Sequence, residues 1–198
     1  MPDDAGLATH GAIRVQPGAG FVTLPNIITF LRLCMVPVAI WLVVHQRMMP
    51  AFWLFTAAGI SDAVDGWLAR RGGATAIGAL IDPMADKTLL VGMYVTLAMV
   101  RVLPDWLAML VVFRDLVIVG GVLALAVLGQ RVPIRPLAIS KLNTALQIGL
   151  VGVALLLAGL GAADEPSLRA ARAVLIWTVA GSTLVSGAAY VVSVARPR

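Results

Sequence analysis

Hydrophobic residues dominate six long stretches of this chain, and short breaks rich in proline, glycine or charge separate them. The stretches cover about residues 27–46, 50–70, 78–101, 104–129, 138–162 and 168–194. Each reaches the roughly 20 residues that an α-helix needs to cross the hydrocarbon core of a bilayer. The pattern therefore predicts an all-α, polytopic membrane protein with six transmembrane helices. Residues 1–22 would form an N-terminal tail, and residues 23–194 a single membrane domain.

The composition supports a membrane protein and excludes several other classes. The 198 residues are 60% hydrophobic and 13% charged, with a mean hydropathy of +0.95, whereas a soluble domain has about 25% charged residues. One cysteine, Cys34, excludes a disulfide framework and a cysteine-based metal site. The net charge of +5 lies mainly in arginines near the predicted helix ends, and we expect no nucleic-acid partner.

The distribution of arginines between the loops predicts the orientation. Cytoplasmic loops of membrane proteins carry an excess of Lys and Arg. We expect both termini on the cytoplasmic side of a bacterial inner membrane, or on the matrix side if the source is mitochondrial. One side of the predicted bundle collects Arg14, Arg70, Arg71, Arg131, Arg135, Arg196 and Arg198, and the other has Arg47, Arg101, Arg169 and Arg172.

Four aspartates interrupt the second and third hydrophobic stretches. A single ionised carboxylate at the centre of a membrane helix costs about 2.5–3.5 kcal/mol, so four together require a compensating cation. Asp62 and Asp65 stand at positions i and i+3, and Asp82 and Asp86 at i and i+4, so each pair shares one helix face. The pairs lie at similar depth on two adjacent helices. They predict an oxygen-rich site for divalent metal ions.

The residues around the aspartates indicate the substrate. Gly66 and Gly78 would let a ligand approach the backbone closely, although small residues also serve helix packing. Arg70 could bind a phosphate bidentately or extend to the membrane interface. Metal ions beside an arginine indicate a phosphate or pyrophosphate substrate. Asp86, the deeper acid of its pair, is the candidate general base for an attacking hydroxyl.

These residues together resemble a known family signature, that of the CDP-alcohol phosphotransferases. The resemblance implies a centre of two divalent ions, Mg²⁺ or Mn²⁺. Asp62, Asp65 and Asp82 would be ligands, and Asp86 a shared ligand or the general base. The matching string is Asp62-x2-Asp65-Gly66-x2-Ala69-Arg70-x7-Gly78-x3-Asp82-x3-Asp86, with every fixed position present.

The resemblance also implies the reaction and the nucleotide site. An alcohol would attack the lipid-linked phosphorus of CDP-diacylglycerol and release CMP. Asn26, Thr29 and Arg32 in the first stretch resemble residues near the nucleotide, although Asn26 could equally be a helix N-cap. Family likeness further suggests a homodimer. The surface that receives the cytidine diphosphate would be formed by Gly66, Ala69, Arg70 and Gly78.

Local sequence favours one acceptor alcohol. The run from Asp82 to Lys87 resembles a subgroup that contains both phosphatidylglycerophosphate synthases and CMP-forming cardiolipin synthases. Two further stretches, Phe113-Arg114-Asp115 followed by Gly120-Gly121 and the run from Ile139 to Gln147, resemble the cardiolipin synthases more. Phosphatidylglycerol is therefore the expected acceptor, and glycerol-3-phosphate the alternative. Lys141 could bind the acceptor phosphate or anchor its helix at the interface. Arg114 could contact the acceptor or be one half of a buried structural pair.

Two other functions fit part of the pattern. An aspartate-rich prenyltransferase would also hold a lipid pyrophosphate through magnesium, but the positions of Gly66, Arg70 and Gly78 argue against it. A cation transporter could line its path with intramembrane acids, yet it should distribute polar groups over both membrane halves. Here the acids gather toward one side. Asn143 and Gln147, one helical turn apart, are expected to bond to neighbouring helices.

Overall fold

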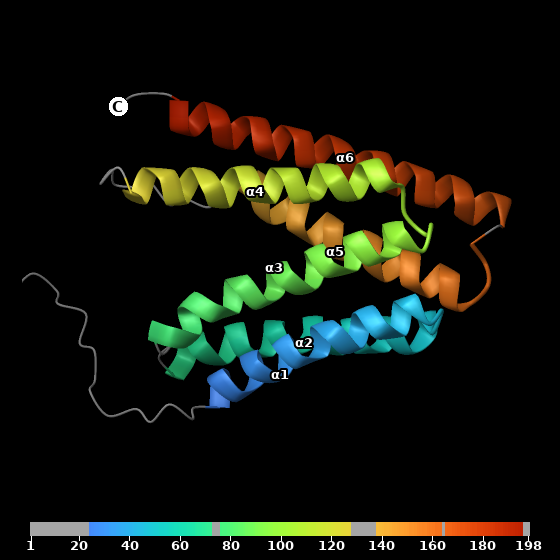
Figure 1. Ribbon diagram of the computed structural model, residues 1–198, viewed down its shortest axis with the longest axis horizontal. Coiled ribbons are helices and arrows are strands. Elements are labelled where there is room, and N and C mark those ends of the chain that lie inside the picture. The colour runs from blue at the N-terminus through green and yellow to red at the C-terminus, as the bar shows by residue number, and fades with distance from the viewer. Residues whose placement is uncertain (1–23, 73–75, 128–137, 164, 196–198) are drawn as a thin grey trace, which may run out of the picture.

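The chain folds into a bundle of α-helices, seen in a computed structural model (Figure 1). The structure describes residues 24–72, 76–127, 138–163 and 165–195, and the side chains of residues 31–61, 87–121, 139–163 and 165–192. Within these ranges every regular element is helical, which confirms the all-α prediction. The helices are α1 (Leu24–Val44), α2 (Met48–Gly72), α3 (Ala76–Met99), α4 (Asp105–Val127), α5 (Ala138–Gly159) and α6 (Pro166–Ala195).

The helices alternate in direction, so the bundle has two distinct ends (Figure 1). One end, here called the α2–α3 end, holds the start of α1, the end of α2 and the start of α3 (left in Figure 1). The opposite end, called the α3–α4 end, holds the α1–α2, α3–α4 and α5–α6 connections. Because the number of described helices is even, α1 begins and α6 finishes at the same end.

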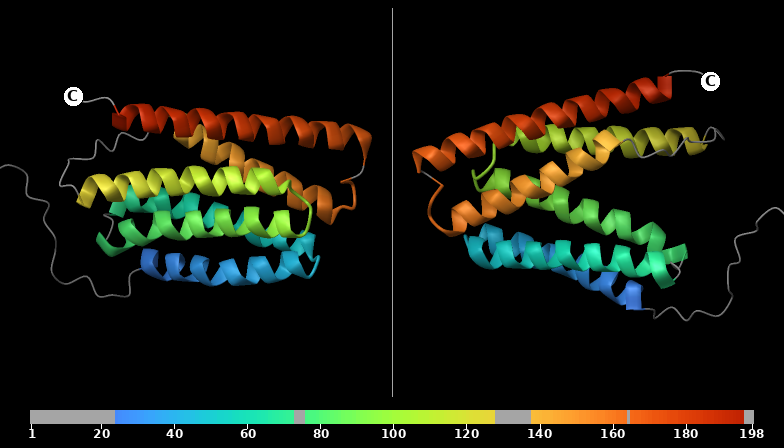
Figure 2. Two further views of the ribbon diagram at one scale, coloured as in Figure 1. Left: turned by 45° about the horizontal axis from the view of Figure 1, so that its top comes forward. Right: turned by 180° about the vertical axis from the view of Figure 1, so that it is seen from behind.

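The helices pack as a ring that is not in sequence order. Within the described ranges, neighbouring helices follow the order α1, α2, α5, α6, α4, α3 and back to α1, and α3 and α5 also meet across the middle. In the right view of Figure 2, α5 runs obliquely between α6 and α2. The ring places a shared interior between helices that are distant in sequence.

Three helices end at the α3–α4 end with the same hydrogen-bonding motif. At the end of α3, the amide of Val102 donates to the carbonyl of Leu97 and that of Arg101 donates to Ala98, at 2.9 Å each. These are the two bonds of a Schellman motif, which needs a left-handed residue. Glycine is the usual residue there, as at the end of α5, but Arg101 takes this conformation at φ 63°. The motifs are centred on Gln46, Arg101 and Gly161.

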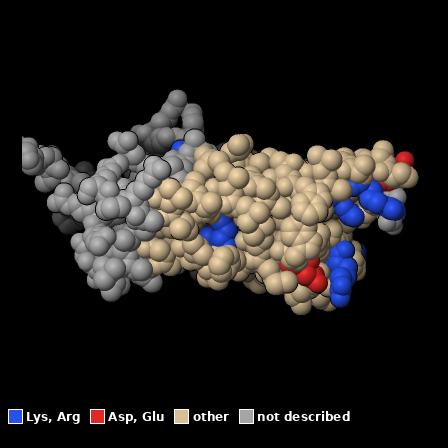
Figure 3. Space-filling view, turned by 90° about the horizontal axis from the view of Figure 1, so that it is seen from above, with Lys and Arg blue, Asp and Glu red and all other residues tan. Residues whose placement is uncertain are grey.

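Apolar side chains fill the interior and also cover the outside. Met93, Tyr94 and Leu97 of α3 are fully buried, and they pack with Leu150 and Leu155 of α5. Large hydrophobic side chains are exposed on all of the six described helices, which is unusual for a soluble monomer. Among the described residues on the face shown in Figure 3, charged side chains include a group at the α3–α4 end.

Two described segments are long and apolar enough to cross a membrane, Ile139–Gly159 and Pro166–Val192. Shorter apolar helical stretches cover Leu31–Val44, Met48–Ser61 and Lys87–Met99. The six predicted helices are therefore present, whereas six membrane crossings stay a prediction.

Candidate functional site

The four aspartates lie on two consecutive helices beside the same link. Asp62 is ten residues before the end of α2, and Asp86 is ten residues after the start of α3. At 1.5 Å per residue, both positions are about 15 Å along their helices from the α2–α3 end. Asp65 and Asp82 are nearer that end, seven and six residues from the same helix limits. The predicted match in depth along the helices is therefore confirmed at the level of the backbone.

The side chains of the signature fall outside the described part of the structure. This applies to the four aspartates and to Gly66, Ala69, Arg70 and Gly78, so their roles as metal ligands and nucleotide contacts stay predictions. No group of three His, Cys, Asp or Glu residues occurs among the residues whose side chains are described. As a donor set, four carboxylates on two neighbouring helices have the hard oxygen chemistry that suits Mg²⁺ or Mn²⁺.

The start of α1 corrects one alternative for Asn26. Helix α1 begins at Leu24, so Asn26 is its third residue and lies inside the first turn. Pro25 is tolerated there, because the first amides of a helix have no intrahelical acceptor. The N-cap alternative for Asn26 is therefore wrong. Its role near a nucleotide, and that of Thr29, stay predictions, since both side chains lie outside the described ones.

A cavity of about 500 Å³ lies inside the ring, next to the aspartate-bearing turns. Its walls come from α1 to α5, and most of them are apolar. The lining includes Ile60, two residues before Asp62, and Lys87, directly after Asp86. A pocket with apolar walls and a few charged groups is the usual form of a site for an amphiphilic ligand.

Three charged side chains line this cavity. Arg32 of α1 is only 2% exposed, a low value for an arginine. Lys87 of α3 pairs with Asp115 of α4 through a contact of 3.1 Å between Nζ and Oδ2. Lys87 thus neutralises an acid outside the aspartate signature. Sequence reasoning did not find this pair, because its two members lie on different helices.

Arg114 ties three helices together beside the same cavity. Its Nη1 donates to Oδ1 of Asp115 at 2.7 Å, and its Nη2 donates to Ser140 Oγ of α5 at 2.7 Å and to Ser186 Oγ of α6 at 2.6 Å. Arg114 is 5% exposed, and only its Nε lacks a partner. The geometry therefore gives Arg114 the structural pairing that was one of its two predicted roles. A contact with the acceptor stays a prediction.

A second polar cluster joins α5 to α6 and to α3. Oδ1 of Asn143 accepts hydrogen bonds from Ser182 and Thr183 at 2.7 and 3.0 Å. Gln147 Nε2 donates to Thr183 at 3.3 Å, and the Tyr94 hydroxyl donates to the carbonyl of Gln147 at 3.2 Å. The expectation that Asn143 and Gln147 bond to neighbouring helices is confirmed, and these bonds fix one wall of the cavity.

Lys141 and two threonines complete the surroundings. The described side chain of Lys141 is exposed and is not part of the cavity lining, so acceptor binding by Lys141 stays a prediction. Thr56 of α2 and Thr144 of α5 line the cavity, and sequence reasoning missed both. In the sequence, each is a threonine within an apolar helix. Such threonines are common in membrane helices and do not by themselves indicate a site.

Comparison with known proteins places this architecture in a family. A family model described as CDP-alcohol phosphatidyltransferase matches residues 22–185. The CDP-diacylglycerol–glycerol-3-phosphate 3-phosphatidyltransferase 1 of Oryza sativa is 34% identical over 188 residues, which cover 86% of this chain and 56% of the relative. A cardiolipin synthase (CMP-forming)/mitochondrial hydrolase fusion protein of Schizosaccharomyces pombe is 34% identical over 191 residues, covering 86% of this chain and 31% of the relative.

The cardiolipin synthase (CMP-forming) of Homo sapiens is 28% identical over 177 residues, covering 81% of this chain and 59% of the relative. The chain thus spans between about a third and three fifths of the length of these relatives. The family model, in contrast, covers most of the chain and both aspartate-bearing helices. The chain therefore belongs to the CDP-alcohol phosphatidyltransferase family.

Proposed function

We propose that this protein transfers a phosphatidyl group from CDP-diacylglycerol to the hydroxyl of an acceptor, with release of CMP. The acceptor oxygen forms a bond to the lipid-linked phosphorus, and the bond from that phosphorus to the CMP oxygen breaks. The hydroxyl proton passes to Asp86. The observation that carries this proposal is the complete aspartate signature, at fixed spacing on two consecutive helices of a chain in this family. Family membership also weighs against the cation-transporter alternative.

Each part of the signature receives a role in this proposal. Asp62, Asp65, Asp82 and Asp86 would hold two divalent ions, Mg²⁺ or Mn²⁺, and dependence on a divalent metal is general in the family. When bound, such ions neutralise charge on the pyrophosphate and on the departing nucleotide. The cytidine diphosphate would lie against Asn26, Thr29, Gly66, Ala69, Arg70 and Gly78.

The cavity inside the ring would receive the glyceride part of a lipid substrate. Its walls are mostly apolar, and its lining is adjacent in the chain to Asp62 and Asp86. Arg32 together with the Lys87–Asp115 ion pair leaves positive charge on the described lining, which suits a phosphate at the polar end of the lipid. Lys141 lies one residue beyond Ser140, the partner of Arg114, and would bind the acceptor phosphate from the exposed side.

The membrane arrangement is part of the proposal. All six helices would cross a bacterial inner membrane, with the aspartates and both termini on the cytoplasmic side. Three observations support this placement: alternating helix directions, exposed apolar side chains on each described helix, and the excess of arginines in the loops at the α2–α3 end. Residues 1–22 would be a cytoplasmic tail and residues 23–194 the membrane domain, and the protein would form a homodimer.

Phosphatidylglycerol is the preferred acceptor in this proposal, giving cardiolipin. Glycerol-3-phosphate, giving phosphatidylglycerophosphate, is the second candidate, because relatives named for each reaction are 34% identical to this chain. The local runs around Arg114 and Lys141 favour cardiolipin formation.

One assay tests both the chemistry and the acceptor. Purified protein receives CDP-diacylglycerol, Mg²⁺ or Mn²⁺, and either phosphatidylglycerol or glycerol-3-phosphate, and CMP and lipid products are measured. We expect cardiolipin and CMP from phosphatidylglycerol, no product after chelation of divalent metals, and loss of CMP release in Asp86→Asn. Product from glycerol-3-phosphate alone would reverse the choice of acceptor. Near-normal turnover in Asp86→Asn would contradict the role of Asp86 as general base.

A further inference from the structure

Arg101 holds a conformation that usually belongs to glycine. It is the left-handed residue of the Schellman motif after α3, with φ 63°. The left-handed conformation costs a non-glycine residue roughly 1–2 kcal/mol. The side chain of Arg101 is exposed and packs into no core, so burial does not offset this cost. Strained residues of this kind cluster at sites that bind ligands.

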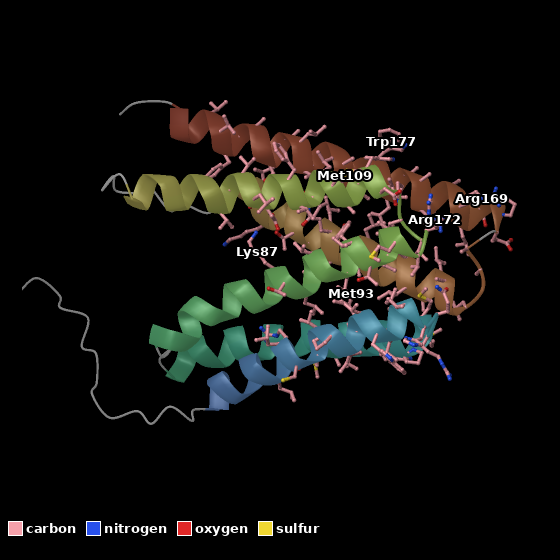
Figure 4. The ribbon with its side chains drawn as sticks, viewed as in Figure 1. Lys87, Met93, Met109, Arg169, Arg172 and Trp177 are labelled. Carbon is pink, nitrogen blue, oxygen red and sulfur yellow. The ribbon has the colours of Figure 1, made fainter. Side chains whose placement is uncertain are left out.

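A small polar pocket lies beside Arg101 at the α3–α4 end. The pocket has a volume of about 270 Å³, and its charged lining residues are Arg101, Asp105 and Arg172. Figure 4 shows Arg172 on α6 beside the α3–α4 connection. Neither Arg101 nor Arg172 has an ion-pair or hydrogen-bond partner for its side chain among the described residues. The two arginines and one aspartate among the described lining residues carry one net positive charge, which complements a singly charged phosphodiester.

An apolar groove of about 540 Å³ continues from the same two residues. Arg101 and Asp105 stand at its polar end, and its walls are formed by α3 and α4. The lining reaches Leu116, so the groove follows α4 for eleven residues from Asp105. At 1.5 Å per residue this is about 16 Å, close to half of the roughly 30 Å hydrocarbon core of a bilayer. Its other walls include Val95, Met99, Met109 and Phe113.

Two tryptophans mark the level of the membrane surface at this end. The rings of Trp106 on α4 and Trp177 on α6 lie 5.2 Å apart at an angle of 33°, and the two residues are 42% and 68% exposed. Tryptophan is enriched where the headgroups meet the hydrocarbon region. The charged pocket therefore lies at the level of a phospholipid headgroup, beside the tryptophans. The apolar groove lies at the level of the acyl chains of the same leaflet.

We infer that the α3–α4 end binds one anionic glycerophospholipid, separate from the aspartate site. Its phosphate contacts Arg101 and Arg172, and one acyl chain lies in the α3–α4 groove. The bound lipid links the α3–α4 connection to α6. This inference rests on the membrane placement proposed above, but not on phosphatidyl transfer.

Photolabelling tests the site directly. The protein is placed in phosphatidylcholine nanodiscs with a trace of phosphatidylglycerol that carries a photoreactive group in its acyl chain. We expect labelled peptides within residues 95–116, and little labelling there with the matching phosphatidylcholine probe. Arg101→Gln combined with Arg172→Gln should lower this labelling between about tenfold and a hundredfold, since each charge-assisted bond contributes on the order of a factor of ten to affinity. Arg47→Gln, an exposed arginine at the same end outside both lining sets, should leave the labelling unchanged.

Two substitutions to glycine distinguish an effect on lipid binding from an effect on stability. Arg101→Gly and Gln46→Gly relieve the same left-handed strain, and each should raise Tm in lipid-free detergent by about 2–4 °C. Only Arg101→Gly should also lower labelling. Equal labelling in wild type and in the Arg101→Gln/Arg172→Gln variant would overturn the inference, as would equal labelling by the two lipids. A disulfide-linked dimer formed through Met109→Cys in a Cys34→Ser background would also overturn it, because a second copy would then occupy the groove.

Transfer activity distinguishes this inference from the proposed function. The Arg101 and Arg172 variants should keep phosphatidyl transfer in detergent while they lose labelling. Asp86→Asn should lose transfer and keep labelling at residues 95–116.

Discussion

Replacing Arg114 by methionine tests whether this residue holds the bundle together or serves the acceptor. The substitution keeps an unbranched side chain and removes the donors to Asp115, Ser140 and Ser186. The two serines lose little, because a hydroxyl can donate to a backbone carbonyl of its own helix. The main effect falls on Asp115, whose remaining ion-pair partner among the described residues is Lys87.

The size of the expected destabilisation depends on how well Lys87 alone balances the charge of Asp115. Removing one partner of a buried ion pair costs about 3–5 kcal/mol. Asp115 is 8% exposed, but its remaining partner Lys87 has a side chain that is 42% exposed and stays within 3.1 Å. We therefore expect the low end of the range, about 3 kcal/mol. For a chain of this length that corresponds to a decrease in Tm of about 6–12 °C.

Thermal unfolding of the purified protein in detergent, followed by tryptophan fluorescence, measures this change. A second variant, Arg114→Met with Asp115→Leu, removes both charges and should recover at least half of the lost Tm, because apolar replacements of a buried pair are often neutral. Arg47→Met, an exposed arginine, is the control and should change Tm by less than about 2 °C. A Tm of Arg114→Met within 2 °C of wild type, with a raised KM for the acceptor, would refute the structural role and favour acceptor binding.

Two further predictions concern the interior of the ring. Gly59 lines the cavity and has open space beside its Cα, so Gly59→Phe should fill the cavity and lower kcat/KM for CDP-diacylglycerol at least about tenfold. Gly149 has equally open space but lies outside the lining, so Gly149→Phe should not lower kcat/KM. A smaller loss in Gly59→Phe than in Gly149→Phe would remove the cavity from the substrate site. Gly159→Ala places a Cβ 3.0 Å from the amide nitrogen of Met49, so we expect about 1–3 kcal/mol of destabilisation, read as a lower Tm; an unchanged Tm would mean that α2 and α5 can move apart freely.

The helices were predictable from sequence because long apolar runs and their breaks leave few alternatives. The main error was at helix ends. The first and third stretches were predicted to reach residues 46 and 101, whereas α1 and α3 end at Val44 and Met99. Gln46 and Arg101 occupy the left-handed positions that follow, and without glycine there the sequence does not show which residue takes the left-handed conformation.

Side-chain partners were predictable only where one helix contained the whole signal. Asn143 and Gln147 stand one turn apart, so their common face could be inferred from spacing, and the structure confirms their bonds to α6. The partner of Lys87 could not be predicted from spacing. Asp115 is 28 residues further along the chain, and it reaches Lys87 only because α3 packs on α4. The cavity likewise depends on the order of helices in the ring, which hydropathy does not encode.

The ring order has a consequence for synthesis of the chain. Helix α5 packs between α2 and α6, so the first four helices form an open arc when they leave the ribosome. In that arc Arg114 and Asp115 have each other and Lys87, but the hydroxyls of Ser140 and Ser186 have not yet been made. In the membrane arrangement proposed above, the last helical hairpin would close the bundle and cover a charge that the nascent protein would otherwise present to lipid. We therefore expect stable insertion of α1 to α4 to require α5 and α6.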